Sequence, residues 1–183
     1  MKIIDKKYIK NNEEKIIREI KAGKIFIYPT DTIYGIGANA KKSTSVAKIR
    51  TIKERELKPF SVIAPNKKWI KDNFVFNKKI EEWTKKLPGP LTLFLDRKNT
   101  ACVSEEVNPA DDSLGVRIPK HWFTKIIQKA GVPFITTSVN KSGQSYMRRM
   151  EDVDSGTLNS VDYIVYEGEK ANKESKKVDL RKI

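Results

Sequence analysis

The chain has almost none of the two residue types that most nucleophilic and zinc enzymes use: one cysteine, Cys102, and one histidine, His121. A single cysteine forms no intramolecular disulfide, so we expect Cys102 to pack in the core of a cytoplasmic protein. No cysteine or histidine accompanies His121 at zinc-ligand spacing, and neither a G-x-S-x-G nor a Walker sequence is present. The sequence therefore argues against a zinc site and a Ser-His-Asp hydrolase, and no metal site made by the protein is predicted.

Long apolar stretches and linker-like segments are also missing. No run approaches the roughly 18 apolar residues that span a bilayer, and the N-terminal residues lack the apolar core of a signal peptide. No internal repeat, low-complexity run or proline-rich linker divides the 183 residues. Hydrophobic residues make up 38% of the chain, so a substantial core is possible. The composition predicts one globular domain over residues 1–183.

Acidic residues are scarce relative to basic ones. The chain has 37 lysines and arginines against 23 aspartates and glutamates, which gives a formal net charge of +14. Such a field attracts polyanions such as nucleotides, RNA or anionic lipid. The excess is mostly lysine, spread along the chain in doublets that also serve solubility. The charge is thus equally compatible with a specific nucleic-acid role and with a merely soluble surface.

Hydrophobic periodicity alternates between the helical and the strand pattern along the chain. Gly23 and Gly131 are placed to end two of the helices, and Ser43 or Thr44 to cap another. Several strands are apolar throughout, which is typical of strands buried on both faces. The sequence therefore predicts an α/β fold with a mixed, largely parallel sheet flanked by helices. Helices are predicted at residues 12–21, 43–53, 78–86, 122–130 and 151–158, and strands at 25–28, 60–64, 91–95, 115–118, 134–137, 163–166 and 178–180.

Polar side chains follow two of the apolar strands directly. Thr30, with the residues up to Tyr34, follows one strand, and Ser138 and Asn140 end another. Ligands of open α/β sheets bind at the carboxyl ends of strands, so both segments are expected at such a crevice. The first segment suits a small polar ligand or a metal-bound water, and the second suits phosphate or sugar oxygens. Ordinary turns rich in the same residues are the alternative for both.

Three basic residues are candidates for holding anions. Lys53 and Arg55, one residue apart at a predicted helix end, offer a point charge and a planar fork to one phosphate. A charged helix C-terminus is the simpler explanation of this pair. Arg117 lies in an otherwise apolar strand and needs a partner. A substrate carboxylate and a structural Asp or Glu both satisfy that need.

Five segments, in this order, resemble the YrdC-type threonylcarbamoyl-AMP synthase family in its short, single-domain form. They are KIFIYPTDTIYGIGANA, IKER with KPFSVIAP, LPGPLTLFL, SLGVRIP and GVPFITTSVNKSG. The resemblance covers roughly residues 22–180. It implies a twisted open α/β fold with a basic concave site.

The resemblance also implies an activity. Family members condense L-threonine, bicarbonate and ATP, with Mg²⁺, into threonylcarbamoyl-AMP and pyrophosphate. Downstream transferase proteins then use the product to modify adenosine 37 of tRNAs that read codons starting with A. By this resemblance Lys53 and Arg55 are the catalytic pair; ATP contacts fall on Lys53, Arg55, Ser113, Ser138 and Asn140; threonine contacts fall on Thr32, Arg117, Thr136 and Ser175; and Thr30, Tyr34 and Lys58 lie nearby.

The sequence departs from the family pattern at three places. Glu56 replaces a proline after the K-x-R pair, Lys58 precedes Pro59 where relatives vary, and Lys176 replaces a threonine after Ser175. Lys176 either makes a new phosphate contact or marks a remodelled segment. Two alternatives to the synthase remain: an RNA-binding or ribosome-maturation protein that binds tRNA or double-stranded RNA, and a paralogue with other carbamoyl chemistry.

Overall fold

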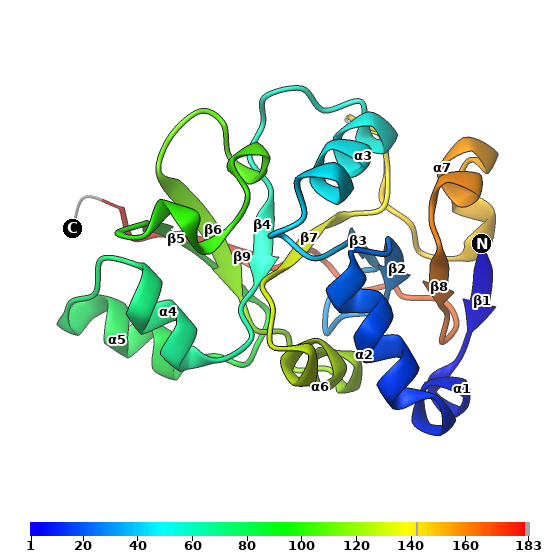
Figure 1. Ribbon diagram of the computed structural model, residues 1–183, viewed down its shortest axis with the longest axis horizontal. Helices are drawn as coiled ribbons and strands as arrows, with labels where there is room; N and C mark the ends of the chain where they lie inside the picture. Colours follow the sequence, from blue (N-terminus) through cyan, green and yellow to red (C-terminus); the bar gives the residue numbers. More distant parts are fainter. Residues whose placement is uncertain (142, 182–183) are drawn as a thin grey trace.

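Nine strands form one twisted sheet in the computed structural model, which describes residues 1–141 and 143–181 (Figure 1). The strand order is β1-β8-β2-β3-β7-β4-β6-β5-β9. The pairs β1–β8, β2–β8, β4–β6 and β5–β9 are parallel, and the other four pairs are antiparallel. The predicted α/β fold with a mixed sheet is confirmed. The strands are β1 (Lys2–Ile4), β2 (Phe26–Tyr28), β3 (Gly35–Gly37), β4 (Ser61–Ile63), β5 (Leu91–Asp96), β6 (Ser113–Arg117), β7 (Phe134–Ser138), β8 (Tyr163–Val165) and β9 (Lys176–Asp179).

Helices cover both faces of the sheet and bury two hydrophobic clusters. Successive strand residues point to opposite faces, so in β2 the side chains of Phe26 and Tyr28 join one cluster and Ile27 joins the other. Helices α3, α4, α5 and α7 pack on the Ile27 side, and α1, α2 and α6 pack on the other. No helix in the described ranges has the length and apolarity to cross a bilayer. The helices are α1 (Lys6–Asn11), α2 (Glu13–Ala22), α3 (Ser43–Lys53), α4 (Lys67–Asn73), α5 (Lys78–Lys85), α6 (Trp122–Ala130) and α7 (Ser155–Ser160), with short 3-10 helices η1 (Thr100–Cys102), η2 (Glu105–Val107) and η3 (Met150–Asp152).

The helix ends test the capping predictions. Gly23 and Gly131 end α2 and α6 in the left-handed conformation, with φ of 91° and 71°, as predicted. The predicted side-chain cap of α3 is wrong: its N-cap is Lys42, in extended backbone, and no side-chain cap hydrogen bond forms. Ser43 instead donates to Glu106 Oε1 at 2.5 Å. Its hydroxyl therefore ties α3 to the η2 segment.

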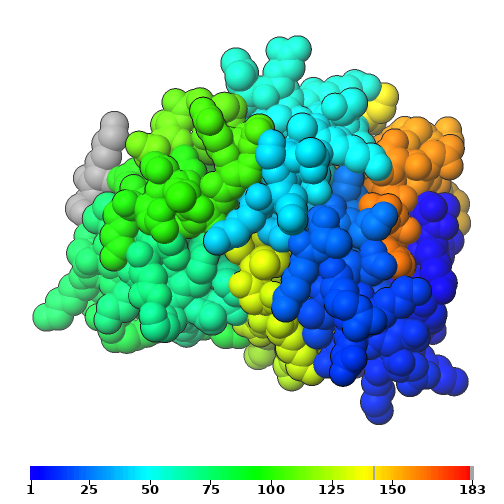
Figure 2. Space-filling model, in the orientation of Figure 1, coloured from blue at the N-terminus to red at the C-terminus, as the bar shows by residue number. Residues whose placement is uncertain are grey.

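Segments far apart in the sequence meet at the edges of the sheet. β1, which was not predicted, pairs with β8, and Figure 2 shows the N-terminal segment beside the segment near residue 160. The predicted helix over 151–158 is two elements, η3 and then α7, because Asp154 caps a new helix through Thr157 N at 3.0 Å. β9 begins at Lys176, two residues before the predicted strand. Helices α1 and α4 were also missed.

The central strand β3 was predicted as part of a loop because its sequence is Gly-Ile-Gly. Glycine disfavours strands through its backbone entropy, so the pattern gives no strand signal. The neighbouring backbone explains the glycine at position 37: a Cβ there would lie 1.8 Å from Ile135 O on β7. Gly37 thus allows β3 to pair with both β2 and β7.

We expect Gly37→Ala to lower the free energy of unfolding by about 1–3 kcal/mol or more, since backbone must move to admit the methyl group. Gly89→Ala is the matched control, because its Cβ would meet its nearest atom, Lys86 O, at 3.4 Å, an ordinary contact. Urea unfolding of both variants measures the difference. Equal midpoints for the two variants would contradict the close approach.

Candidate active site

A cavity of about 370 Å³ opens on one face of the sheet. On β4 and β7 this is the face that carries Ile63 and Phe134, which α6 and its cluster cover. Two residues along each strand, Ser61 and Thr136 point to the same face and line the cavity instead. The cavity is lined by Thr30, Ile33, Tyr34, Gly35, Arg55, Lys58, Pro59, Ser61, Thr92, Phe94, Arg117, Thr136, Thr137, Ser138, Glu174, Ser175 and Lys177.

The buried ammonium of Lys53 joins the end of α3 to the turn after β7. Its Nζ donates to Ser138 O and Asn140 O at 2.6 Å each and to Asn140 Oδ1 at 2.8 Å. Ser138 Oγ donates to the same Oδ1 at 2.6 Å. Lys53 is 2% exposed, and burial, with Arg55 nearby, lowers the pKa of its ammonium to about 8, against an opposing effect of Glu174. The K-x-R segment, Lys53 to Arg55, and the S-x-N segment, Ser138 to Asn140, therefore meet, as the sequence predicted.

Arg55 emerges from the same helix end at the cavity. Glu54 between them adopts φ of 49° and ends α3, so Lys53 points inward and Arg55 points toward the cavity. The guanidinium donates to Pro59 O at 2.6 Å and Lys58 O at 3.1 Å, with a longer contact of 3.4 Å to Thr137 Oγ1. No carboxylate of the described chain pairs with it. Its charge is therefore available to an anion in the cavity.

Arg117, at the end of β6, has the structural carboxylate partner that was one of the two possibilities left open by the sequence. Its Nη2 donates to Asp31 Oδ1 at 2.7 Å and to Thr32 Oγ1 at 3.2 Å, so a structural carboxylate exists. Asp31 is itself held by Lys120 N at 2.8 Å. Nε of Arg117 is buried and has no partner within residues 1–141 and 143–181. The Arg117 side chain also lines the cavity, and a guanidinium there suits a ligand carboxylate.

Thr30 and Tyr34 fix the wall beside Arg117. Thr30 Oγ1 donates to Ile33 O at 2.7 Å and accepts from Thr32 N at 3.1 Å, which closes a hydroxyl-stabilised turn. The Tyr34 hydroxyl donates to Gly168 O at 2.6 Å and accepts from Glu167 N at 3.1 Å. Burial raises the pKa of Tyr34 to about 12, so the phenol stays protonated at neutral pH. Tyr34 thereby ties the segment leading to β9 to the cavity.

The family model Sua5_yciO_yrdC, described as Telomere recombination, matches residues 18–182. The chain belongs to the Sua5/YciO/YrdC family. The resemblance inferred from the five sequence segments is confirmed.

Relatives of this family member are similar over most of its length. A Methanocaldococcus jannaschii protein, named as a candidate threonylcarbamoyl-AMP synthase, is 39% identical over 173 residues, 88% of this chain and 79% of that protein. The Bos taurus threonylcarbamoyl-AMP synthase is 32% identical over 141 residues, 74% of this chain and 49% of the relative. P. abyssi Sua5 complexed with L-threonine superposes with a TM-score of 0.86 at 26% identity, over 98% of this chain and 54% of that one. This chain thus spans about half the length of the bovine relative and of P. abyssi Sua5.

Most of the residues predicted from the Sua5/YciO/YrdC resemblance line the cavity: Thr30, Tyr34, Arg55, Lys58, Arg117, Thr136, Ser138 and Ser175. Thr32 lies behind Arg117, and Lys53 and Asn140 lie behind the S-x-N turn, outside the lining. Ser113 is at the other end of β6, about 13 Å along the strand from Arg117, and accepts from Arg181 Nη1 at 3.4 Å. The ligand contacts assigned to all twelve residues, including the eight that line the cavity, stay predictions.

Sequence reasoning missed several cavity residues on neighbouring strands and in the segment before β9: Ser61, Thr92, Phe94, Lys177 and Glu174. Strand alternation contained part of the signal. In β5 the polar and aromatic side chains of Thr92 and Phe94 alternate with Leu93 and Leu95, which are fully buried in the core. The pairing of β9 with β5 that brings Glu174 and Lys177 to this face has no local sequence signal.

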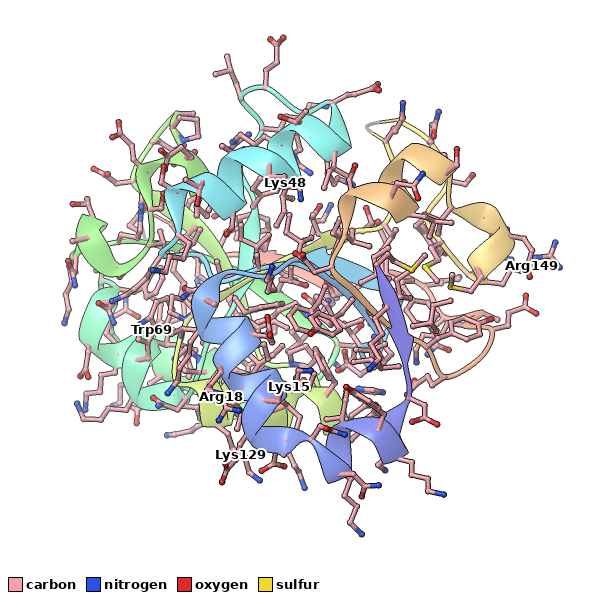
Figure 3. The ribbon with its side chains drawn as sticks, turned by 45° about the vertical axis from the view of Figure 1, so that its right-hand side comes forward. Lys15, Arg18, Lys48, Trp69, Lys129 and Arg149 are labelled. Carbon is pink, nitrogen blue, oxygen red and sulfur yellow. The ribbon has the colours of Figure 1, made fainter. Side chains whose placement is uncertain are left out.

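Replacement of Lys53 tests its structural role. We expect Lys53→Met to lower the free energy of unfolding by about 2–4 kcal/mol, because three acceptors lose their donor at about 1–3 kcal/mol per buried unpaired group. Lys48→Met, on an exposed face of the same helix (Figure 3), is the matched control and should change it by about 0.5 kcal/mol or less. Urea unfolding at neutral pH compares them. A similar loss in both variants would remove Lys53 from this role.

The pH dependence of the same comparison follows from the depressed pKa of Lys53. The pKa of Lys53 is about 8 in the folded protein and 10.5 when unperturbed, so between these two pH values the unfolded chain binds more protons at this site. The contribution of the Lys53 side chain to the free energy of unfolding therefore rises with pH through that window, as the buried charge is lost, and is smallest below it. We expect the stability difference between wild type and Lys53→Met to grow from pH 8 to pH 10. A flat difference would mean that Lys53 keeps its ordinary pKa.

Proposed function

We propose that this chain is an L-threonylcarbamoyladenylate synthase, which condenses L-threonine, bicarbonate and ATP to threonylcarbamoyl-AMP and pyrophosphate for the modification of adenosine 37 in tRNA. One observation carries the proposal. A single cavity holds the guanidinium of Arg117 together with Arg55 and Lys58, two cations that have no carboxylate partner among the described residues. The names of the M. jannaschii and bovine relatives, and the L-threonine complex of P. abyssi Sua5, support it.

The part of the cavity around Arg117 suits an amino acid. The guanidinium's planar fork matches a carboxylate, and Asp31 fixes its orientation through Nη2. The hydroxyl of Thr136 lies in the same lining and can meet the polar groups of threonine, while Thr30 holds the turn beside it. Thr32 and Ser175 complete the proposed threonine set.

The part around Arg55 suits a triphosphate. Arg55 and Lys58 provide charge, and the turn held by Lys53 provides the Ser138 side of the wall. The threonine amine is first captured by bicarbonate as a carbamate, with loss of water. A carbamate oxygen then attacks the ATP α-phosphorus, the bond from that phosphorus to the α–β bridging oxygen breaks, and pyrophosphate leaves. An anionic nucleophile needs no strong base; alignment and fixed cations around the transition state are what the site must supply.

Mg²⁺ enters this proposal with ATP. The described residues contain no group of three or more His, Cys, Asp or Glu side chains that could hold a metal ion. Among the described residues that line the cavity, Glu174 is the one carboxylate, which fits the usual Mg²⁺ arrangement of one or two carboxylates plus substrate phosphates. When bound, the ion would neutralise phosphate charge, and Glu174 is the residue proposed to contact it.

Omission of single substrates tests the activity. Pyrophosphate release should require ATP, L-threonine and bicarbonate together, because the nucleophile forms only from the last two. Mass spectrometry of the products should show threonylcarbamoyl-AMP. Release of pyrophosphate without threonine would contradict the assignment.

Arg117→Lys separates the two parts of the cavity. The lysine keeps a charge for Asp31 but loses the fork, so the KM for threonine should rise about tenfold to a hundredfold, as expected for a charge-assisted hydrogen bond. The KM for ATP should change much less. Initial rates with each substrate varied measure both, and thermal unfolding controls for the fold. An equal rise in the two KM values would contradict a carboxylate contact by Arg117.

Fewer observations support the remaining partners, which are the downstream transferase proteins and RNA. Downstream transferase proteins enter this proposal as the expected recipients of the product. Direct binding of tRNA or double-stranded RNA rests on the net charge of +14. Exposed lysines such as Lys15, Lys48 and Lys129 lie on three different helices (Figure 3), which is a distribution that also serves solubility.

A further inference from the structure

The edge strand β9 brings a lysine into the cavity that no family motif marks. β9 pairs in parallel with β5, with Lys177 opposite Thr92. Paired residues point to the same face of a sheet, and Thr92 lines the cavity. Ser175 and Lys177 accordingly line the cavity, whereas Lys176 between them does not.

The register that places Lys177 is held at the start of β9. Lys176 N donates to Pro90 O at 2.9 Å, and the hydroxyls of Ser175 and Thr92 are 2.8 Å apart. A slip by one residue would break both contacts and turn Lys177 away. The hydrogen bonds of Ser175 and Lys176 therefore fix the strand register that turns Lys177 toward the cavity.

We propose that Lys177 binds phosphate oxygens of ATP, as a third cation of the site beside Arg55 and Lys58. This inference rests on the proposed function. Four basic residues line the cavity, and Arg117 is already paired with Asp31. Glu174 is the one acidic residue in the lining, and within the described ranges Lys177 makes no ion pair. A cation without a partner in a cavity with an excess of positive charge is suited to a polyanion.

The same geometry distinguishes the two adjacent lysines as candidates for the phosphate contact. Lys176 stands where the family has a threonine, and the sequence alone leaves open a new phosphate contact by Lys176 or a remodelled segment. It lies on the opposite face of β9, exposed and outside the lining. The phosphate contact is therefore assigned to Lys177, and Lys176→Ala becomes a control on the same strand.

Equilibrium binding tests the assignment without turnover. The probes are α,β-methylene-ATP, adenosine and L-threonine, titrated into wild type, Lys177→Ala, Lys177→Arg and Lys176→Ala. Lys177→Ala should weaken binding of the ATP analogue about tenfold to a hundredfold, as loss of a charge-assisted hydrogen bond predicts. Binding of adenosine and threonine should change by no more than about twofold, Lys177→Arg should retain most of the affinity, and Lys176→Ala should match wild type.

The outcomes separate this inference from the proposed function. Equal affinity of Lys177→Ala and Lys176→Ala for the ATP analogue overturns the role of Lys177, even if wild type releases pyrophosphate normally. A selective loss in Lys177→Ala, in a protein that never releases pyrophosphate, supports Lys177 and overturns the synthase. An equal loss for adenosine and the ATP analogue overturns the phosphate contact. Thermal unfolding of each variant identifies any loss that reflects the fold.

Discussion

The site depends on one buried interaction, the ammonium of Lys53 held by the oxygens of Ser138 and Asn140. Burying a charge is costly unless hydrogen bonds replace its water, and here all three donors are used. The contact joins the end of α3 to the end of β7, segments separated by more than 80 residues. Arg55 reaches the cavity because it lies two residues after this anchor. In this chain the two basic residues of the K-x-R pair have different positions: Lys53 holds the turn, and Arg55 lines the cavity.

The floor of the cavity, formed by the hydroxyl-bearing residues of the sheet, is neutral. The charge of the cavity comes from basic side chains around this floor, which form its rim. The sheet face contributes hydroxyls from Ser61, Thr92 and Thr136, which offer dipoles and no net charge. Gly115 leaves room for the Ser61 side chain, because a Cβ at position 115 would lie 2.3 Å from Ser61 Oγ. Basic side chains come from the loop after α3, from the end of β6 and from the edge strand β9. An anion on such a floor meets few repelling groups, so the rim cations can act at short range.

The fold could be predicted where the chain carries a local signal. Apolar runs and glycine caps located most helices and strands. The signal failed where contacts with distant residues decided the structure: β3 exists because Gly37 fits against Ile135 O, and its own sequence disfavours a strand. The same reason separates Lys53 from Arg55, and Lys176 from Lys177. Each pair is chemically similar in sequence, and only the backbone turn or the strand register decides which side chain is buried or faces the cavity.

The cations of the site also differ in what they offer before any ligand binds. Arg117 is nearly neutralised by Asp31 at 2.7 Å, so its part of the cavity presents a hydrogen-bonding fork with little net field. Arg55, Lys58 and Lys177 have no such partner in the described chain, and Glu174 offsets only part of their charge. A zwitterionic amino acid suits the first environment, since it brings no net charge to balance. A triphosphate suits the second, because its charge replaces the missing carboxylates. The division of paired and unpaired cations thus matches the two proposed substrates by charge.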